Sequence, residues 1–318
     1  MAQILVTGAG GFTGRALCPA LAAAGHRVIA GLRRPAPADA AFAAGIAPRV
    51  IGDLAPGRDW APLLRGADIV IHLAQQAHRP ADRRVLAAEP AVAAGLAAAA
   101  ARHGVRRFVY LSSIKAMAEA TAPDRPLCAG DPPHPEDAYG RAKRASEEAL
   151  ARAAAATGIE LVVIRPPLVY GPGVGGNFRA LARLAASGLP LPFAALANRR
   201  SLIYVANLAH LIAIAATHPA ASGQELLAAD GAALPICELI RILAAGQRRR
   251  ARLLAVPAPV FAPLRHLPAI GAAVARLSLP LEVDDAPTRA LLGWTPPHAA
   301  EAALLLTARA LARAQESR

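Results

Sequence analysis

The sequence predicts an α/β protein with a doubly wound parallel sheet and a smaller C-terminal α+β domain. In the first half of the chain, short runs of β-branched residues alternate with longer alanine-rich stretches, which is typical of β-α units. Hydrophobic residues make up 55% of the 318 residues but aromatic residues only 4%, so we expect helices with small faces that pack closely. Beyond residue 166 the alternation loosens, and glycine and proline cluster.

Six strands and four long helices are expected in the first half. The strands are predicted at 3–7, 27–31, 48–52, 68–73, 106–112 and 160–165, and the helices at 13–24, 59–65, 84–103 and 137–157. Later helices are predicted at 177–187, 206–217, 235–245 and 299–314, and short strands near 201–205 and 224–229. We therefore divide the chain into residues 1–170 and 171–318, and regard 201–217 as a segment able to return to the main sheet.

The basic charge of the chain does not by itself identify a partner. Lys and Arg number 35 against 22 Asp and Glu, which gives a formal net charge of +13. The dense run at 248–252 has no interleaved aromatic residues on which bases can stack, so we expect no nucleic-acid partner. A positive field would instead attract an anionic substrate.

The cysteines and the apolar segments narrow the possibilities further. Cys18, Cys128 and Cys237 are far apart and in no ligand spacing, so we expect neither a disulfide framework nor a metal. The first residues are typical of a strand rather than of a signal peptide, which favours the cytoplasm. Arg265 and several prolines interrupt the apolar segment 257–281, so we expect no membrane partner.

A glycine-rich turn follows the first predicted strand. The stretch TGAGGFTG, residues 7–14, fits the spacing GxxGxxG with Gly8, Gly11 and Gly14. Glycines in this position let backbone N–H groups approach a pyrophosphate at the positive end of the next helix. The turn alone is a weak signal, but its place between the first strand and the first helix predicts a dinucleotide site.

The residue after the second strand bears on which dinucleotide binds. An acidic residue about 20 positions beyond the glycines suits the ribose hydroxyls of NAD, whereas an arginine suits the 2′-phosphate of NADP. Arg33 stands at about that distance from Gly14. We therefore expect NAD or NADP, with NADP slightly favoured.

Three further residues predict a catalytic set. Tyr139 and Lys143 lie four positions apart in the helix predicted at 137–157, so their side chains share one face. A nearby ammonium and a nicotinium ring favour the phenolate, and together they could lower the pKa of a tyrosine toward neutrality. Ser113 follows the fifth strand, where a hydroxyl can hold a substrate carbonyl. Each feature alone has a purely structural explanation; the combination predicts acid-base catalysis.

With these motifs the chain resembles the extended short-chain dehydrogenase/reductase family, which includes nucleotide-sugar epimerases, dehydratases and ketoreductases. The motifs follow the family order at 7–14, 52–54, 72–74, 111–113, 139–143 and 165–172. The resemblance implies a Rossmann fold and a homodimer. It also implies a cofactor site made of Gly8, Gly11, Phe12, Thr13, Gly14, Arg33, Asp53, Leu54, Leu73, Ala74, Tyr139, Lys143 and Pro166.

The later part of the chain resembles UDP-glucose 4-epimerases and related nucleotide-sugar 4-ketoreductases. By that resemblance Asn177 and Arg200 hold a nucleotide diphosphate, and Ser113 contacts the sugar. Two departures stand out. The stretch 117–118 reads Met-Ala where the typical epimerase has Tyr-Gly, and 276–284 shows no clear match for a second phosphate-binding arginine.

The resemblance implies hydride transfer at carbon 4 of a nucleotide-sugar, by an epimerase or a ketoreductase that acts on a UDP-linked substrate. The alternative hypothesis for an enzyme is reduction of another small ketone, such as a steroid or flavonoid. Asn177 and Arg200 favour the nucleotide-sugar over this alternative. A dinucleotide-sensing module without catalysis is the third possibility. Such a module has no need of Ser113, Tyr139 and Lys143 together.

Overall fold

The computed structural model describes residues 1–35, 42–74, 83–267 and 271–316, and its centre is a parallel sheet of seven strands. These strands are β1 (Gln3–Thr7), β2 (Arg27–Leu32), β3 (Ile46–Val50), β4 (Ile69–His72), β5 (Arg107–Leu111), β6 (Glu160–Arg165) and β11 (Glu225–Leu227). Their order is β11-β6-β5-β4-β1-β2-β3, and all neighbours are parallel. Strands β1 to β6 have the order of a doubly wound dinucleotide-binding sheet, and β11 is added at the edge beside β6. This order confirms the predicted fold class.

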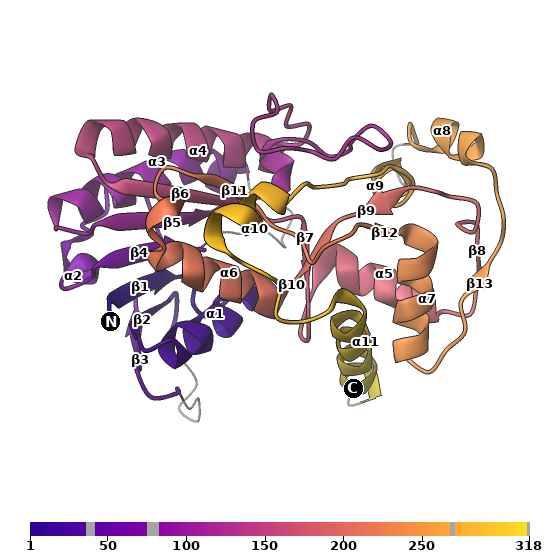
Figure 1. Cartoon of the computed structure of the whole chain (residues 1–318), viewed down its shortest axis with the longest axis horizontal. Coiled ribbons are helices and arrows are strands. Elements are labelled where there is room, and N and C mark those ends of the chain that lie inside the picture. The colour runs from indigo at the N-terminus through magenta and orange to yellow at the C-terminus, as the bar shows by residue number, and fades with distance from the viewer. Residues whose placement is uncertain (36–41, 75–82, 268–270, 317–318) are drawn as a thin grey trace.

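Helices cover both faces of this sheet (Figure 1). The helices are α1 (Phe12–Ala23) and α6 (Val205–Thr217) on one face, and α2 (Ala61–Leu64), α3 (Arg83–Arg102) and α4 (Ala138–Thr157) on the other. Side chains alternate along β1, so Val6 packs in the core beneath α1 and α6 while Leu5 packs in the core beneath α3 and α4. A strand buried on both faces must be largely apolar, as the central strands β1 and β4 are.

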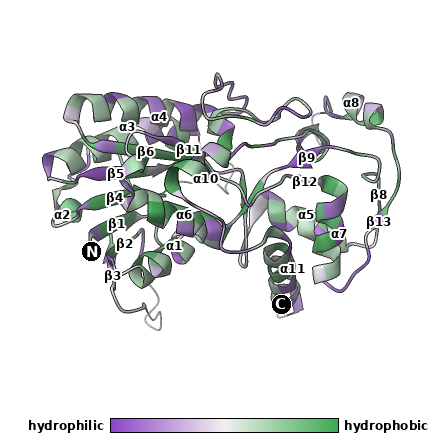
Figure 2. Ribbon diagram, viewed as in Figure 1, coloured by the Kyte–Doolittle hydropathy of each residue, from purple (hydrophilic) through white to green (hydrophobic). Residues whose placement is uncertain are grey.

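Hydropathy follows these layers (Figure 2): hydrophobic residues recur along the strands of the sheet and along α6. By length and composition, α3 is the one helix in the described part of the chain that is able to cross a membrane. In the fold α3 packs against α4, and its residues Leu96 and Ala100 are fully buried in the core against the sheet. Of its apolar window, 33% is buried inside the fold.

A second, smaller group of elements carries its own core. Its strands are β7 (Leu168–Tyr170), β8 (Pro190–Leu191), β9 (Arg199–Arg200), β10 (Leu202–Tyr204), β12 (Leu234–Pro235) and β13 (Arg252–Leu253), and its helices are α5 (Gly176–Ala186), α7 (Ile236–Gly246), α8 (Phe261–Leu264), α9 (Gly271–Ser278) and α11 (Ala300–Glu316). Helix α10 (Ala286–Leu292) instead places Leu292 in the core beneath α1 and α6. Phe178, Ile240 and Leu304 are fully buried among α5, α7 and α11. The small strands pair two by two.

The long elements lie within a few residues of their predicted bounds. Helix α4 begins after Asp137, whose Oδ1 accepts a hydrogen bond from the Gly140 N–H at 2.6 Å, and it ends at Gly158, which has a φ of 75°. A side-chain N-cap and a left-handed glycine are strong boundary signals, which is why the sequence locates this helix well.

The segment 201–217 does not add a strand to the main sheet. Strand β10 pairs with β7 instead, and it is β11 that lies beside β6. Helix α6 does return, because it packs on α1 over one face of the sheet. Elements from both sides of residue 170 thus build the layer around the sheet, and the division at that residue remains a prediction.

Candidate active site

A cavity of about 1350 Å³ opens at the carboxyl ends of the central strands. Eight of the residues predicted to bind the cofactor line it: Gly8, Gly11, Gly14, Arg33, Asp53, Leu54, Leu73 and Ala74. Doubly wound sheets bind ligands at this edge, at the point where the strand order reverses. Here the reversal lies between β1 and β4.

The turn between β1 and α1 has the shape that a pyrophosphate requires. Gly8 has a φ of +77°, and a Cβ on Gly14 would come within 2.6 Å of the Ala9 Cα. Glycine is therefore needed at both positions. Helix α1 begins directly after Gly11 and has no acidic residue in its first turn, so its positive end is free to attract an anion. The turn thus fits a dinucleotide.

Arg33 and Asp53 stand on the rim of the same cavity. The Arg33 Nε lies 3.9 Å from the Asp53 Oδ1, and the side chains are 51% and 85% exposed. An exposed pair at this distance is weak. The Arg33 guanidinium can therefore exchange this partner for a phosphate at little cost.

The structure brings Ser113 to Tyr139. Ser113 follows β5, its Oγ accepts a hydrogen bond from the Lys115 N–H at 3.2 Å, and its side chain hydrogen-bonds to the Tyr139 hydroxyl. The neighbouring Ser112 is buried and donates instead to Glu147. Of the two serines, it is therefore Ser113, the residue chosen from the sequence, that interacts with the phenol.

Lys143 is fully buried on the same face of α4. Its Nζ lies 5.7 Å from the centre of the Tyr139 ring. It donates to the Glu89 Oε1 at 2.9 Å, the Tyr110 hydroxyl at 3.1 Å and the Leu111 carbonyl at 3.3 Å. An ammonium has three N–H donors, so these three contacts use them all.

The electrostatics of Tyr139 differ from the sequence prediction. Burial raises the pKa of Tyr139, the negative charge of Glu89 raises it further, and the hydrogen bond from Ser113 lowers it in part. Burial also lowers the pKa of Lys143, against the opposing effect of Glu89. From the sequence, we expect Lys143 and a nicotinium ring to lower the pKa of Tyr139. The Glu89 carboxylate and burial act in the opposite direction, because both disfavour the phenolate.

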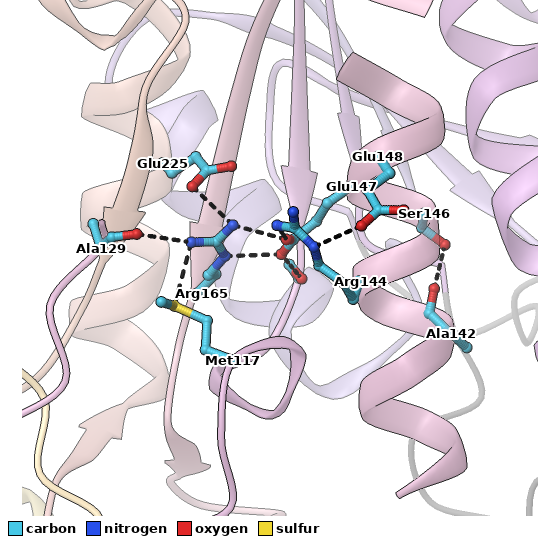
Figure 3. A network of polar contacts seen from close by, with 10 residues as sticks. Met117, Ala129, Ala142, Arg144, Ser146, Glu147, Glu148, Arg165 and Glu225 are labelled. Carbon is cyan, nitrogen blue, oxygen red and sulfur yellow. Dashed lines mark hydrogen bonds and ion pairs between the residues drawn. The ribbon is translucent and has the colours of Figure 1, made fainter. Parts of the chain in front are cut away.

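A second buried network attaches α4 to the sheet (Figure 3). Glu147, on the same helix as Lys143, accepts hydrogen bonds from the Arg165 Nε at 2.9 Å and from its Nη2 at 2.8 Å. Both side chains are almost completely buried. Arg165 also pairs with Glu225 of β11 at 2.9 Å. Since Ser112 donates to Glu147 as well, the network joins α4 to β5, β6 and β11.

On the side of the smaller elements, two arginines come together. The Arg200 Nη1 donates to the Leu279 carbonyl at 2.8 Å. Burial, and then the positive charge of Arg276, lower the pKa of Arg200 to about 10. The sequence showed no clear match for a second arginine within 276–284, but the structure brings Arg276 of α9 near Arg200. Asn177 lies exposed in the first turn of α5.

The remaining predicted residues flank these groups. Phe12 begins α1, and its ring lies beside Gly171, where an added Cβ would come 3.4 Å from the Phe12 Cζ. Thr13 lies in the same first turn. The Pro166 carbonyl accepts a hydrogen bond from the Ile114 N–H at 2.9 Å, which holds the segment after Ser113 against the end of β6.

Sequence reasoning missed two residues of this site. Glu89 is the one acidic residue in the alanine-rich sequence of α3, and it lines the cavity. A lone acidic residue in such a helix is a signal of a functional position, but it does not indicate which residue it pairs with. Arg276 lies in an apolar segment, and only the path of the chain through α9 brings it to Arg200.

Comparisons with known proteins agree with this geometry. The family model described as the NAD dependent epimerase/dehydratase family matches residues 4–228. The chain is 36% identical over 274 residues, 83% of each chain, to a UDP-glucose 4-epimerase of Vibrio cholerae. It is 32% identical over 256 residues, 76% of this chain and 75% of the other, to a 2-alkyl-3-oxoalkanoate reductase of Stenotrophomonas maltophilia.

A solved structure, a UDP-N-acetylglucosamine 4-epimerase from Bacillus cereus, has the same fold with a TM-score of 0.76. Its sequence identity is 20%, and the match covers 98% of this chain and 100% of that one.

Replacing Glu147 with glutamine tests the network that attaches α4. The buried Arg165 would lose its bidentate carboxylate, so we expect a loss of about 3 kcal/mol in the free energy of unfolding. The control is Glu148→Gln, which weakens only an exposed pair with Arg144 and should cost less than about 1 kcal/mol. Urea denaturation measures both. Equal losses in the two variants would contradict a structural role for the network.

Proposed function

We propose, on the premise that the chain belongs to the NAD-dependent epimerase/dehydratase family, that it carries out oxidation or reduction at carbon 4 of a nucleotide-sugar. The substrate class that we propose is UDP-linked, and the reaction is 4-epimerisation or 4-ketoreduction. The observation that carries the proposal is the convergence of Ser113, Tyr139 and Lys143 beside a cavity suited to a dinucleotide. The similarity to a UDP-glucose 4-epimerase supports the substrate class.

Different residues around the cavity bind different parts of the dinucleotide. The turn from Gly8 to Gly14 holds the pyrophosphate, and Asp53 and Leu54 contact the adenine. Arg33 holds a 2′-phosphate where one is present. Bound in this place, the nicotinamide cofactor supplies or accepts the hydride.

The protein itself handles the proton and the orientation of the substrate. The Ser113 hydroxyl, which touches the Tyr139 hydroxyl, holds the reacting oxygen of the sugar by a hydrogen bond. Tyr139 donates its proton to that oxygen when a carbonyl is reduced, and it accepts a proton when an alcohol is oxidised. The Lys143 ammonium, buried nearby, stabilises the phenolate that remains after donation.

Arg200 and Arg276 provide the site for the diphosphate of the substrate. Two neighbouring guanidinium groups repel each other until an anion lies between them, and this repulsion contributes to the lowered pKa of Arg200. Arginine pairs with phosphate in a bidentate manner, so a diphosphate satisfies both groups. Asn177, exposed at the start of α5, is the third candidate contact.

Reduction of a different ketone is the second candidate, because of the similarity to a 2-alkyl-3-oxoalkanoate reductase. The same Ser113 and Tyr139 would act on such a substrate. The two candidates differ at Arg200 and Arg276, because only a nucleotide-sugar brings a diphosphate to these two cations. The experiment is incubation with a panel of UDP- and dTDP-sugars, their 4-keto forms and 3-oxoalkanoates, with and without NAD(P)H, followed by product analysis.

Tyr139→Phe removes the proton donor and little contact area. We expect turnover of the substrate found in that panel to fall by about 100-fold or more, while the Kd for the cofactor changes little. Tyr204→Phe removes a phenol from a tyrosine outside this site and should leave turnover unchanged. Steady-state kinetics and cofactor fluorescence measure the two quantities. Full turnover in Tyr139→Phe would refute the catalytic assignment.

Arg33→Ala tests the cofactor preference. A charge-assisted contact contributes roughly 1.5–3 kcal/mol, so the affinity for NADP should fall by about 10- to 100-fold and the affinity for NAD should change little. Arg102→Ala, at an exposed position near the end of α3, is the control and should affect neither. Binding titrations with both cofactors measure this. Much tighter binding of NAD than of NADP by the wild-type protein, or NAD that co-purifies with it, would contradict the prediction.

A further inference from the structure

Helix α3 brings one carboxylate to the buried end of the active site. The Glu89 side chain is 10% exposed and lines the cavity that we assign to the dinucleotide. One of its oxygens, Oε1, accepts hydrogen bonds from the Lys143 Nζ at 2.9 Å and from the Tyr110 hydroxyl at 3.0 Å. Glu89 therefore contacts the ammonium of the catalytic set directly.

The contacts leave Lys143 little freedom. Besides Glu89, its Nζ donates to Tyr110 and to the Leu111 carbonyl, and it lies 4.8 Å from the centre of the Tyr110 ring. The ammonium thus occupies a fixed position between α3, α4 and β5. Glu89 is the one group among these partners that carries a full negative charge, so it determines the net charge next to Tyr139.

We propose that Glu89 is a positioning residue that holds Lys143 and opposes its charge, so that Tyr139 stays protonated and the site favours carbonyl reduction. This inference rests on the proposed function. In the reduction, the carbonyl carbon receives a hydride from the nicotinamide cofactor and the oxygen receives the Tyr139 proton, which solvent then replaces. Oxidation needs the opposite starting state, a phenolate, which a neighbouring carboxylate disfavours.

The direction of the effect follows from the charges that surround the pair. The titratable groups facing Tyr139 and Lys143 in the described part of the chain are Glu89 from α3, His72 from β4, Tyr110 from β5, Asp137 before α4 and Glu147 from α4. Burial, and then the charge of Lys143, lower the pKa of His72 to about 3, so His72 is neutral at physiological pH.

Removing the charge of Glu89 makes it easier for either Tyr139 or Lys143 to lose a proton, because each loss lowers the positive charge of the site. For Tyr139 this means that its pKa falls, because the Glu89 charge that raises it is gone. Reduction is active below this pKa and oxidation above it. The alkaline limit of reduction and the acid limit of oxidation must therefore both move to lower pH when residue 89 is neutral.

The test is Glu89→Gln in the full-length protein, which keeps the shape and a hydrogen-bond acceptor but removes the charge. The readout is kcat against pH in both directions, with the ketone that the panel identifies and with its alcohol. We expect the alkaline limit of reduction and the acid limit of oxidation to move down by about one pH unit or more. Glu148→Gln, the same change at a position of α4 that is 48% exposed, should move neither limit.

A lower kcat with both limits unmoved would show a merely structural role and overturn the inference. Glu89→Asp keeps the charge but withdraws the carboxylate from Lys143, so it should move both limits in the same direction by less. If Glu89→Gln does not fold, Glu89→Asp decides the matter, because unmoved limits in that variant also overturn the inference.

A separate measurement distinguishes failure of the inference from failure of the proposed function. In thermal unfolding, Glu89→Gln and Lys143→Met should be strongly non-additive, with the double variant more stable than either single variant. These four proteins, the wild type, the two single variants and the double variant, form a double-mutant cycle. A wild-type protein that converts none of the ketones refutes the proposed function, whatever this cycle shows. Additive losses in the cycle refute the pairing of Glu89 with Lys143, whatever the activity.

Discussion

The burial of the Lys143 ammonium is the constraint on which the arrangement of the site depends. A buried charge costs several kcal/mol unless a partner and hydrogen bonds compensate for it. Lys143 is fully buried, and Glu89, Tyr110 and Leu111 supply that compensation. Glu89 reaches Lys143 only because α3 lies directly against α4. The alanine residues of both helices, such as the buried Ala93 and Ala142, make this close approach possible.

Helix α4 is held in place a second time, by Glu147. Lys143 and Glu147 are one turn apart on α4, and each enters the protein core with a full charge that a residue from another element neutralises. Glu89 comes from α3, and Arg165 from the end of β6. Two buried ion pairs of this kind determine both the position and the rotation of α4. Tyr139, four residues before Lys143, is thereby directed toward Ser113.

The sequence was sufficient for the features that depend on local rules. The glycine turn and the spacing of Tyr139 and Lys143 each follow from backbone geometry or helix periodicity, and the structure has them. The two-residue strands such as β9 were missed, because so short a segment has no period of its own. The homodimer and the cytoplasmic location also remain predictions.

Residues that matter through distant partners were beyond sequence reasoning. Glu89 and Lys143 are 54 positions apart, and Arg200 and Arg276 belong to separate elements, so no local pattern links either pair. The pKa of Tyr139 depends on such a distant partner as well. The prediction included the ammonium on its own helix but not the carboxylate on the neighbouring one.

Of the two proposed reactions, 4-epimerisation and 4-ketoreduction, the pairing of Glu89 with Lys143 favours reduction of a carbonyl by an external nicotinamide cofactor and the Tyr139 proton. The most direct test is to supply NADPH that carries deuterium at the transferred position, together with a UDP- or dTDP-4-keto-sugar, and to examine the product by mass spectrometry and NMR. The account predicts one deuterium on carbon 4 of the product, formed as NADPH is consumed. Conversion of a UDP-sugar to its 4-epimer without label from the added cofactor would contradict it.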